Sequence, residues 1–160
     1  MKRFSPSSLL WRTAGLAVLT GARSMMGAAL LSRQLQKSPS RRLGRSRLAF
    51  MQSSRTARVF TLLAAGEIVG DKLPGTPDRI SPMPLIGRGL AGALVGATLF
   101  ARQRQPRRTG VAVGALSAVA GTYATFYLRK RLGQTTGLSD TVWAVLEDGV
   151  VVVLGRRLLR

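Results

Sequence analysis

The chain has 160 residues, of which 25 are Lys or Arg and 6 are Asp or Glu, so its formal net charge is +19. It contains no Cys and no His, which excludes a disulfide scaffold, thiolate metal sites and the commonest general base. The length is that of one domain, and the charge suggests nucleic acid or anionic lipid as a partner. The positive mean hydropathy, +0.15, points away from a soluble nucleic-acid-binding protein.

Apolar runs alternate with basic blocks along the whole chain. The apolar runs cover residues 13–32, 59–70, 85–101, 109–128 and 141–155. A helix needs about 20 apolar residues to cross a bilayer core of about 30 Å. Residues 109–128 contain no charge, and residues 13–32 contain one, Arg23. A soluble helical bundle would instead spread its charges along each helix.

This alternation predicts an all-α, polytopic membrane helix bundle of about five membrane segments, in one integral membrane domain that covers residues 1–160. The segments 59–70 and 141–155 are short and carry acids, so each could span fully or be re-entrant. The Lys and Arg bias favours an N-terminus outside, a C-terminus inside, and basic loops 33–58 and 102–108 on the cytoplasmic side. The basic block 129–131 opposes this orientation, and a re-entrant segment would change it.

The first 66 residues contain no acid and are rich in Arg and Ser, as in an organelle transit peptide. The apolar run 13–32 is too long and uniform for an amphipathic presequence, and Arg12 interrupts the apolar stretch that a signal peptide needs. We therefore expect the whole chain to be retained. An organelle inner membrane is the alternative location to a bacterial cytoplasmic membrane.

Small residues recur at helical spacing in the third and fourth apolar runs. Gly92 and Gly96 are four residues apart, as are Gly110 and Gly114. Glycines at this spacing let helix backbones approach closely in lipid. We expect them to pack the two helices within one chain, with a homo-oligomer contact as the alternative.

Charged residues inside the apolar runs are the candidate functional residues, because such residues are costly in a bilayer and face partners inside the protein. The predicted intramembrane polar site consists of Arg23, Glu67, Asp71, Glu147 and Asp148, with Lys72 and Arg88 near the interface. One interpretation is a structural lock, in which Arg23 pairs with Glu67, Glu147 or Asp148. The other starts from the surplus of acids, because an unpaired buried carboxyl is protonated or holds a cation.

These interpretations lead to different functions. A surplus of acids indicates a small transporter or channel-like protein for a proton, cation or small solute, and a lock indicates a non-catalytic scaffold or partner subunit. A lipid phosphotransferase with a divalent cation is a minor alternative, because the dense Asp motif of such enzymes is missing. No cofactor is expected, and the identity of any metal is open. Anionic lipid headgroups are the expected partners of the basic loops, and nucleic acid is not, because residues 33–58 contain only Phe50 as an aromatic platform.

Several of these residues form a recognisable set. It comprises Gly21-Ala22-Arg23-Ser24, the stretch from Gly66-Glu67 through Asp71-Lys72 to Pro74 and Pro77, Arg88 in a Gly-rich run, and Glu147-Asp148. This set resembles the small bacterial multi-spanning membrane proteins of the domain-of-unknown-function family 4126, over residues 14–155. The family often has a proline after each of the two arginines, where this chain has Met25 and Gly89. The resemblance implies an integral protein of the bacterial cytoplasmic membrane with no assigned activity.

Overall fold

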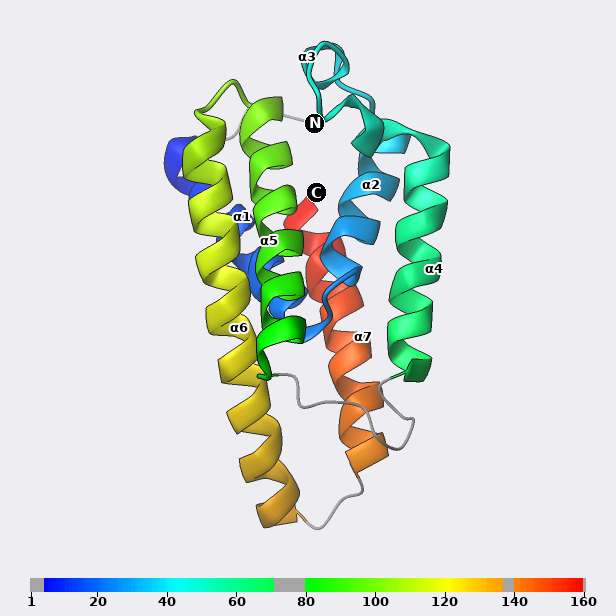
Figure 1. Cartoon of the computed structure of the whole chain (residues 1–160), viewed down its shortest axis with the longest axis vertical. Helices are drawn as coiled ribbons and strands as arrows, with labels where there is room; N and C mark the ends of the chain where they lie inside the picture. The colour runs from blue at the N-terminus through cyan, green and yellow to red at the C-terminus, as the bar shows by residue number, and fades with distance from the viewer. Residues whose placement is uncertain (1–4, 71–79, 137–139, 160) are drawn as a thin grey trace.

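A computed structural model describes residues 5–70, 80–136 and 140–159 (Figure 1). Every regular element in these ranges is a helix. In chain order they are α1 (Pro6–Ala22), α2 (Met26–Lys37), α3 (Arg41–Gly44), the short 3-10 helix η1 (Ala49–Gln52), α4 (Ser54–Gly70), α5 (Pro82–Arg102), α6 (Arg107–Thr136) and α7 (Asp140–Leu159). Asp71 and Lys72 lie outside the described residues. Glu147 belongs to α7, but its side chain is not among those described.

The run 13–32, predicted as one membrane segment, is instead the vertex of a helical hairpin, and that prediction is corrected. The first helix ends at Ala22, Arg23 is extended with φ −138° and ψ 103°, and α2 begins at Met26. The chain then turns back along α1 (Figure 1). Only glycine fits at position 27, because a Cβ there would lie 2.0 Å from Thr20 Oγ1 and 3.2 Å from the Leu16 carbonyl oxygen.

The hairpin lies inside a bundle of longer helices. The first helix packs against α5, α6 and α7, whereas α2 packs against α4, α5 and α7. Side chains from both arms are fully buried in the resulting core, among them Leu16, Leu31 and Leu35, together with Val95 of α5. The hairpin is therefore part of the core and not an appendage on the surface.

The helix ends sort into two groups (Figure 1). Both ends of the hairpin, the start of α4, the end of α5, the start of α6 and the end of α7 lie toward one end of the molecule, and we call this the basic end. The ends of α4 and α6 and the starts of α5 and α7 lie toward the other. Residues 33–58, expected as a loop, contain the end of α2, all of α3 and η1, and the start of α4.

The outer surface of the bundle is apolar. Two helices, α5 and residues Arg107–Gly133 of α6, are long and apolar enough to cross a bilayer. Only 22% of the most apolar stretch of α6 is buried, whereas a core helix of a soluble protein would be mostly buried. Leu62, Leu90 and Leu116 point outward from α4, α5 and α6 with about two thirds or more of their surface exposed (71%, 67% and 71%). The described chain thus has two candidate membrane spans, fewer than the five segments expected.

Glycines set the distance between α5 and α6, which make the most extensive contact in the bundle. A Cβ at Gly96 would lie 2.0 Å from the Gly110 carbonyl oxygen, and one at Gly114 would lie 2.1 Å from that of Gly92. The four glycines thus lie face to face, backbone against backbone, within one chain. A similar contact joins α6 to α1, where a Cβ at Gly121 would lie 2.6 Å from the Val18 carbonyl oxygen.

Replacing Gly114 by Ala should push α5 and α6 apart, because the new methyl group would meet backbone that cannot rotate away. We expect Gly114→Ala to lower the free energy of unfolding by about 1–3 kcal/mol, measured by thermal or denaturant unfolding in detergent. Gly87→Ala is the matched control on α5, since nothing lies within 4 Å of a Cβ there. Equal effects of the two substitutions would contradict this account of the contact.

Candidate functional site

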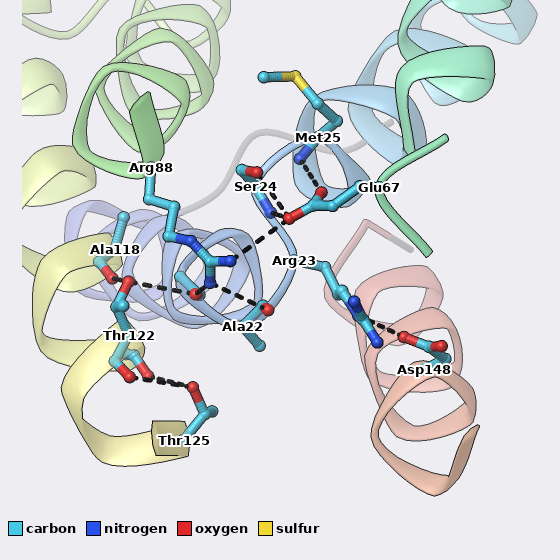
Figure 2. Close-up of polar contacts among 12 residues, drawn as sticks. Ala22, Arg23, Ser24, Met25, Glu67, Arg88, Ala118, Thr122, Thr125 and Asp148 are labelled. Carbon is cyan, nitrogen blue, oxygen red and sulfur yellow. Dashed lines mark hydrogen bonds and ion pairs between the residues drawn. The ribbon is translucent and has the colours of Figure 1, made fainter. Parts of the chain in front are cut away.

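The hairpin vertex, residues 23–25, leaves two helix ends inside the protein. A helix leaves its last carbonyl groups without intrahelical donors and its first N–H groups without acceptors. Water satisfies these groups at a surface, but no water is present in a bilayer core, so protein groups must do so. The end of α1 is therefore expected to need donors and the start of α2 to need acceptors. Figure 2 shows where both come from.

The end of α1 is satisfied by donors from α5 and α6. Arg88 Nη1 donates to the carbonyl oxygens of Gly21 and Ala22, the latter at 3.2 Å. Thr122 Oγ1 of α6 donates to the Gly21 carbonyl oxygen at 3.1 Å and also lies 2.9 Å from the Ala118 carbonyl oxygen of its own helix. A cation at a helix C-terminus also opposes the negative end of the helix dipole.

The start of α2 is satisfied by a single carboxylate from α4. Glu67 Oε1 accepts from the Ser24 backbone N–H at 2.9 Å and from Ser24 Oγ at 2.7 Å, and Oε2 accepts from the Met25 backbone N–H at 3.1 Å. The N-cap residue of α2, Met25, makes no side-chain cap of its own. Glu67 thus acts as the N-terminal cap of α2 from a helix more than 40 residues further along the chain, with the charge that the dipole favours there.

The two capping residues also pair with each other. Arg88 Nη2 lies 3.5 Å from Glu67 Oε1, and the two side chains are only 4% and 12% exposed. One ion pair therefore joins α4 to α5 across the vertex, with its cation on the end of α1 and its anion on the start of α2. Arg88, expected near the membrane interface, is instead buried in the bundle, and that expectation is corrected.

A second ion pair ties the vertex to α7. Arg23 Nε donates to Asp148 Oδ1 at 2.6 Å, and the Arg23 side chain is 1% exposed. Charge-assisted bonds of this length are among the strong ones in proteins. Arg23 points away from Glu67 toward α7 (Figure 2), so of the partners considered for Arg23 the structure selects Asp148.

The structure thus brings together four of the predicted residues, Arg23, Glu67, Arg88 and Asp148, at one place in the fold. The glycines lie apart from them, at the α5–α6 contact. Sequence reasoning did not identify Ser24 or Thr122 as members of the site. Ser24 adjoins Arg23, but nothing in the spacing of Thr122 distinguishes it from other threonines in transmembrane helices.

The surroundings of the ion pairs are apolar. A hollow of about 250 Å³ lies beside the hairpin between α1, α6 and α7, lined by side chains such as Val18, Ala22 and Val151. None of the four charged residues lines it. Within the described part of the chain, no group of three or more acidic or other ligating side chains could hold a metal ion. The arrangement binds helix ends and opposite charges, and offers no group poised for catalysis among the side chains described.

Arg88→Lys should weaken the site even though it keeps the charge. Arg88 uses one guanidinium nitrogen for the end of α1 and another for Glu67, whereas an ammonium group is a point charge that cannot span both. We expect a loss of about 1–3 kcal/mol in the free energy of unfolding in detergent. The control is Arg108→Lys at an exposed position on α6, which should change little. A fully stable Arg88→Lys protein would show that the bridging geometry is unimportant.

Comparison with known proteins adds no relative. No family model, no curated protein and no solved structure matches this chain. The resemblance to family 4126 stays a prediction that depends on the residues that carry it. Three of those residues, Arg23, Glu67 and Arg88, are among the charged side chains gathered at the hairpin vertex.

Proposed function

We propose that the protein is a non-catalytic, multi-pass membrane protein, acting as a scaffold or partner subunit, in which a re-entrant hairpin is locked in place by two ion pairs. One observation carries the proposal. Both of the acids whose side chains are described within the bundle are occupied, Asp148 by Arg23 and Glu67 by Arg88 and the N–H groups of the vertex. A surplus of intramembrane acids was the reason to expect transport, and these two acids provide none.

The energetics favour a lock. A buried charge that loses its partner costs about 3–5 kcal/mol, so each residue of these pairs holds its partner's helix in place. Glu67, Arg88 and Asp148 come from three different helices and meet on a hairpin from a fourth and a fifth. The lock therefore fixes five helices at one point, which suits a rigid membrane scaffold.

The charge distribution supports one orientation. Of the described Lys and Arg residues, fifteen lie toward the basic end and only three, residues 129–131, lie toward the other. Because Lys and Arg near membrane segments remain in the cytoplasm, we assign the basic end to the cytoplasmic side. A re-entrant hairpin then puts the N-terminus inside together with the C-terminus. This replaces the orientation expected from five full crossings, and residues 129–131 no longer oppose the bulk of the charge beyond a small block.

Transport of an ion or small solute is the second candidate, and a specific observation favours it. Opposed helix ends inside a membrane bundle are the usual architecture of substrate and ion sites in transporters. Here those ends are filled by Arg88 and Glu67. Transport at this site would require a substrate to displace one of them, so the buried pair would have to open during each cycle.

Removing one or both members of the Arg23–Asp148 pair separates the two functions. Arg23→Met and Asp148→Leu should each lower the free energy of unfolding in detergent by about 3–5 kcal/mol, because each strands a buried charge. The double variant should recover most of that stability, since no charge is left unpaired. Proton and cation flux into proteoliposomes should be absent for the wild-type protein and the double variant alike.

The opposite pattern would support transport. Flux by the wild-type protein that the stable double variant has lost would assign the pair a role beyond structure. Arg156→Met, at an exposed position on the same helix as Asp148, is the control for a general effect of lost positive charge.

A further inference from the structure

A second charged feature lies at the basic end, apart from the ion pairs. A pocket of about 640 Å³ opens between α2, the first turns of α4 and the last turns of α7. Three helices contribute basic side chains to its lining: Arg33 and Lys37 from α2, Arg58 from α4 and Arg156 from α7. All four side chains are exposed and so are accessible to a ligand.

No acid among the described side chains balances these charges. No Asp or Glu lines the pocket, and the two described intramembrane acids, Glu67 and Asp148, are engaged at the hairpin vertex. Arg58 makes one weak bond, from Nε to the Ser54 carbonyl oxygen at 3.4 Å, which leaves both Nη groups available to a ligand. Four cations that share one pocket repel one another, and an anion bound among them relieves this repulsion. Guanidinium groups match the oxygens of a phosphate especially well, because they donate in parallel pairs.

The walls of the pocket indicate where that phosphate comes from. Its inner side is apolar and includes Leu30 and Leu159, the latter only 4% exposed. Beyond Arg58 the outer face of α4 continues with Val59 and Leu62, which are 53% and 71% exposed. A basic rim next to an apolar wall is what a lipid needs for its headgroup and acyl chains, whereas a free phosphate has no use for the apolar wall.

We propose that this pocket binds the phosphate group of an anionic membrane lipid, with preference for a headgroup that carries two negative charges. The preference follows from four cations in one pocket, which a singly charged headgroup leaves largely unbalanced. The inference rests on the membrane placement proposed above, because the pocket then lies at headgroup depth on the cytoplasmic side. It does not rest on the ion-pair lock.

The test measures lipid binding to the full-length protein in zwitterionic detergent by native mass spectrometry. The probes are phosphatidic acid, phosphatidylglycerol, phosphatidylcholine and soluble glycerol phosphate. Phosphatidic acid should bind best, and Arg33→Gln with Arg156→Gln should weaken it by about tenfold. Arg45→Gln with Arg47→Gln removes the same charge from the segment between α2 and α4, outside the pocket, and should leave the preference intact. The unfolding temperature without lipid should be the same for all three proteins.

Three results would overturn the proposal. Equal losses in the two double variants would mean that surface charge in general attracts the lipid. Displacement of phosphatidic acid by an equal concentration of glycerol phosphate would identify a site for free phosphate. The absence of any preference in the wild-type protein would mean that the pocket has no phosphate site.

Carbonate washing of membranes separates failure of this inference from failure of the membrane placement. A chain released by carbonate would refute the membrane placement and the lipid site together. A chain that stays in the membrane, but shows no preference among headgroups, would refute the lipid site alone.

Discussion

A helix that ends inside a bilayer must have its free backbone groups satisfied by the protein, and the rest of this structure depends on that constraint. The hairpin of α1 and α2 presents carbonyl oxygens and N–H groups at one buried vertex. Arg88 binds the first set and Glu67 the second. The positions of α4 and α5 relative to the hairpin follow, because each must bring one of these side chains to the vertex. Asp148 places α7 in the same way through Arg23.

The two ends of each helix carry charges of opposite preference, and the lock uses both. A cation lies on the negative end of the α1 dipole and an anion on the positive end of the α2 dipole. Neither residue is therefore paired only with the other. This explains how a separation of 3.5 Å between Arg88 and Glu67, too long for a strong hydrogen bond, is sufficient at this site.

The sequence predicted the helical class and most of the charged site, because apolar runs and buried charges are properties of composition and position. It did not predict the hairpin. Residues 13–32 contain no proline, and Met25 supplies no side-chain cap, so no local signal ends a helix at Ala22. The cap arrives from Glu67, and a contact between segments so distant in the chain cannot be read from local spacing. The same limit applies to Thr122, whose role depends on where α6 crosses the end of α1.

Other features follow once the hairpin is recognised. The burial of Arg88 is a consequence of the vertex, since no other described part of the bundle needs a cation at that depth. Bringing both arms of the hairpin to one end also gathers most of the basic residues there. A charge of +19 that first suggested nucleic acid then acquires two separate explanations, membrane orientation and the lipid pocket, while two of the arginines stay inside the bundle.

The most direct test of the re-entrant hairpin is the sidedness of single cysteines, which the native chain lacks. Ser7→Cys and Pro39→Cys flank the hairpin at exposed positions, and Gly133→Cys marks the other end of the bundle. A membrane-impermeant maleimide applied to sealed vesicles should label positions 7 and 39 from the same face, the cytoplasmic one, and position 133 from the opposite face. Labelling of positions 7 and 39 from opposite faces would mean that residues 13–32 cross the membrane once, and would contradict the account.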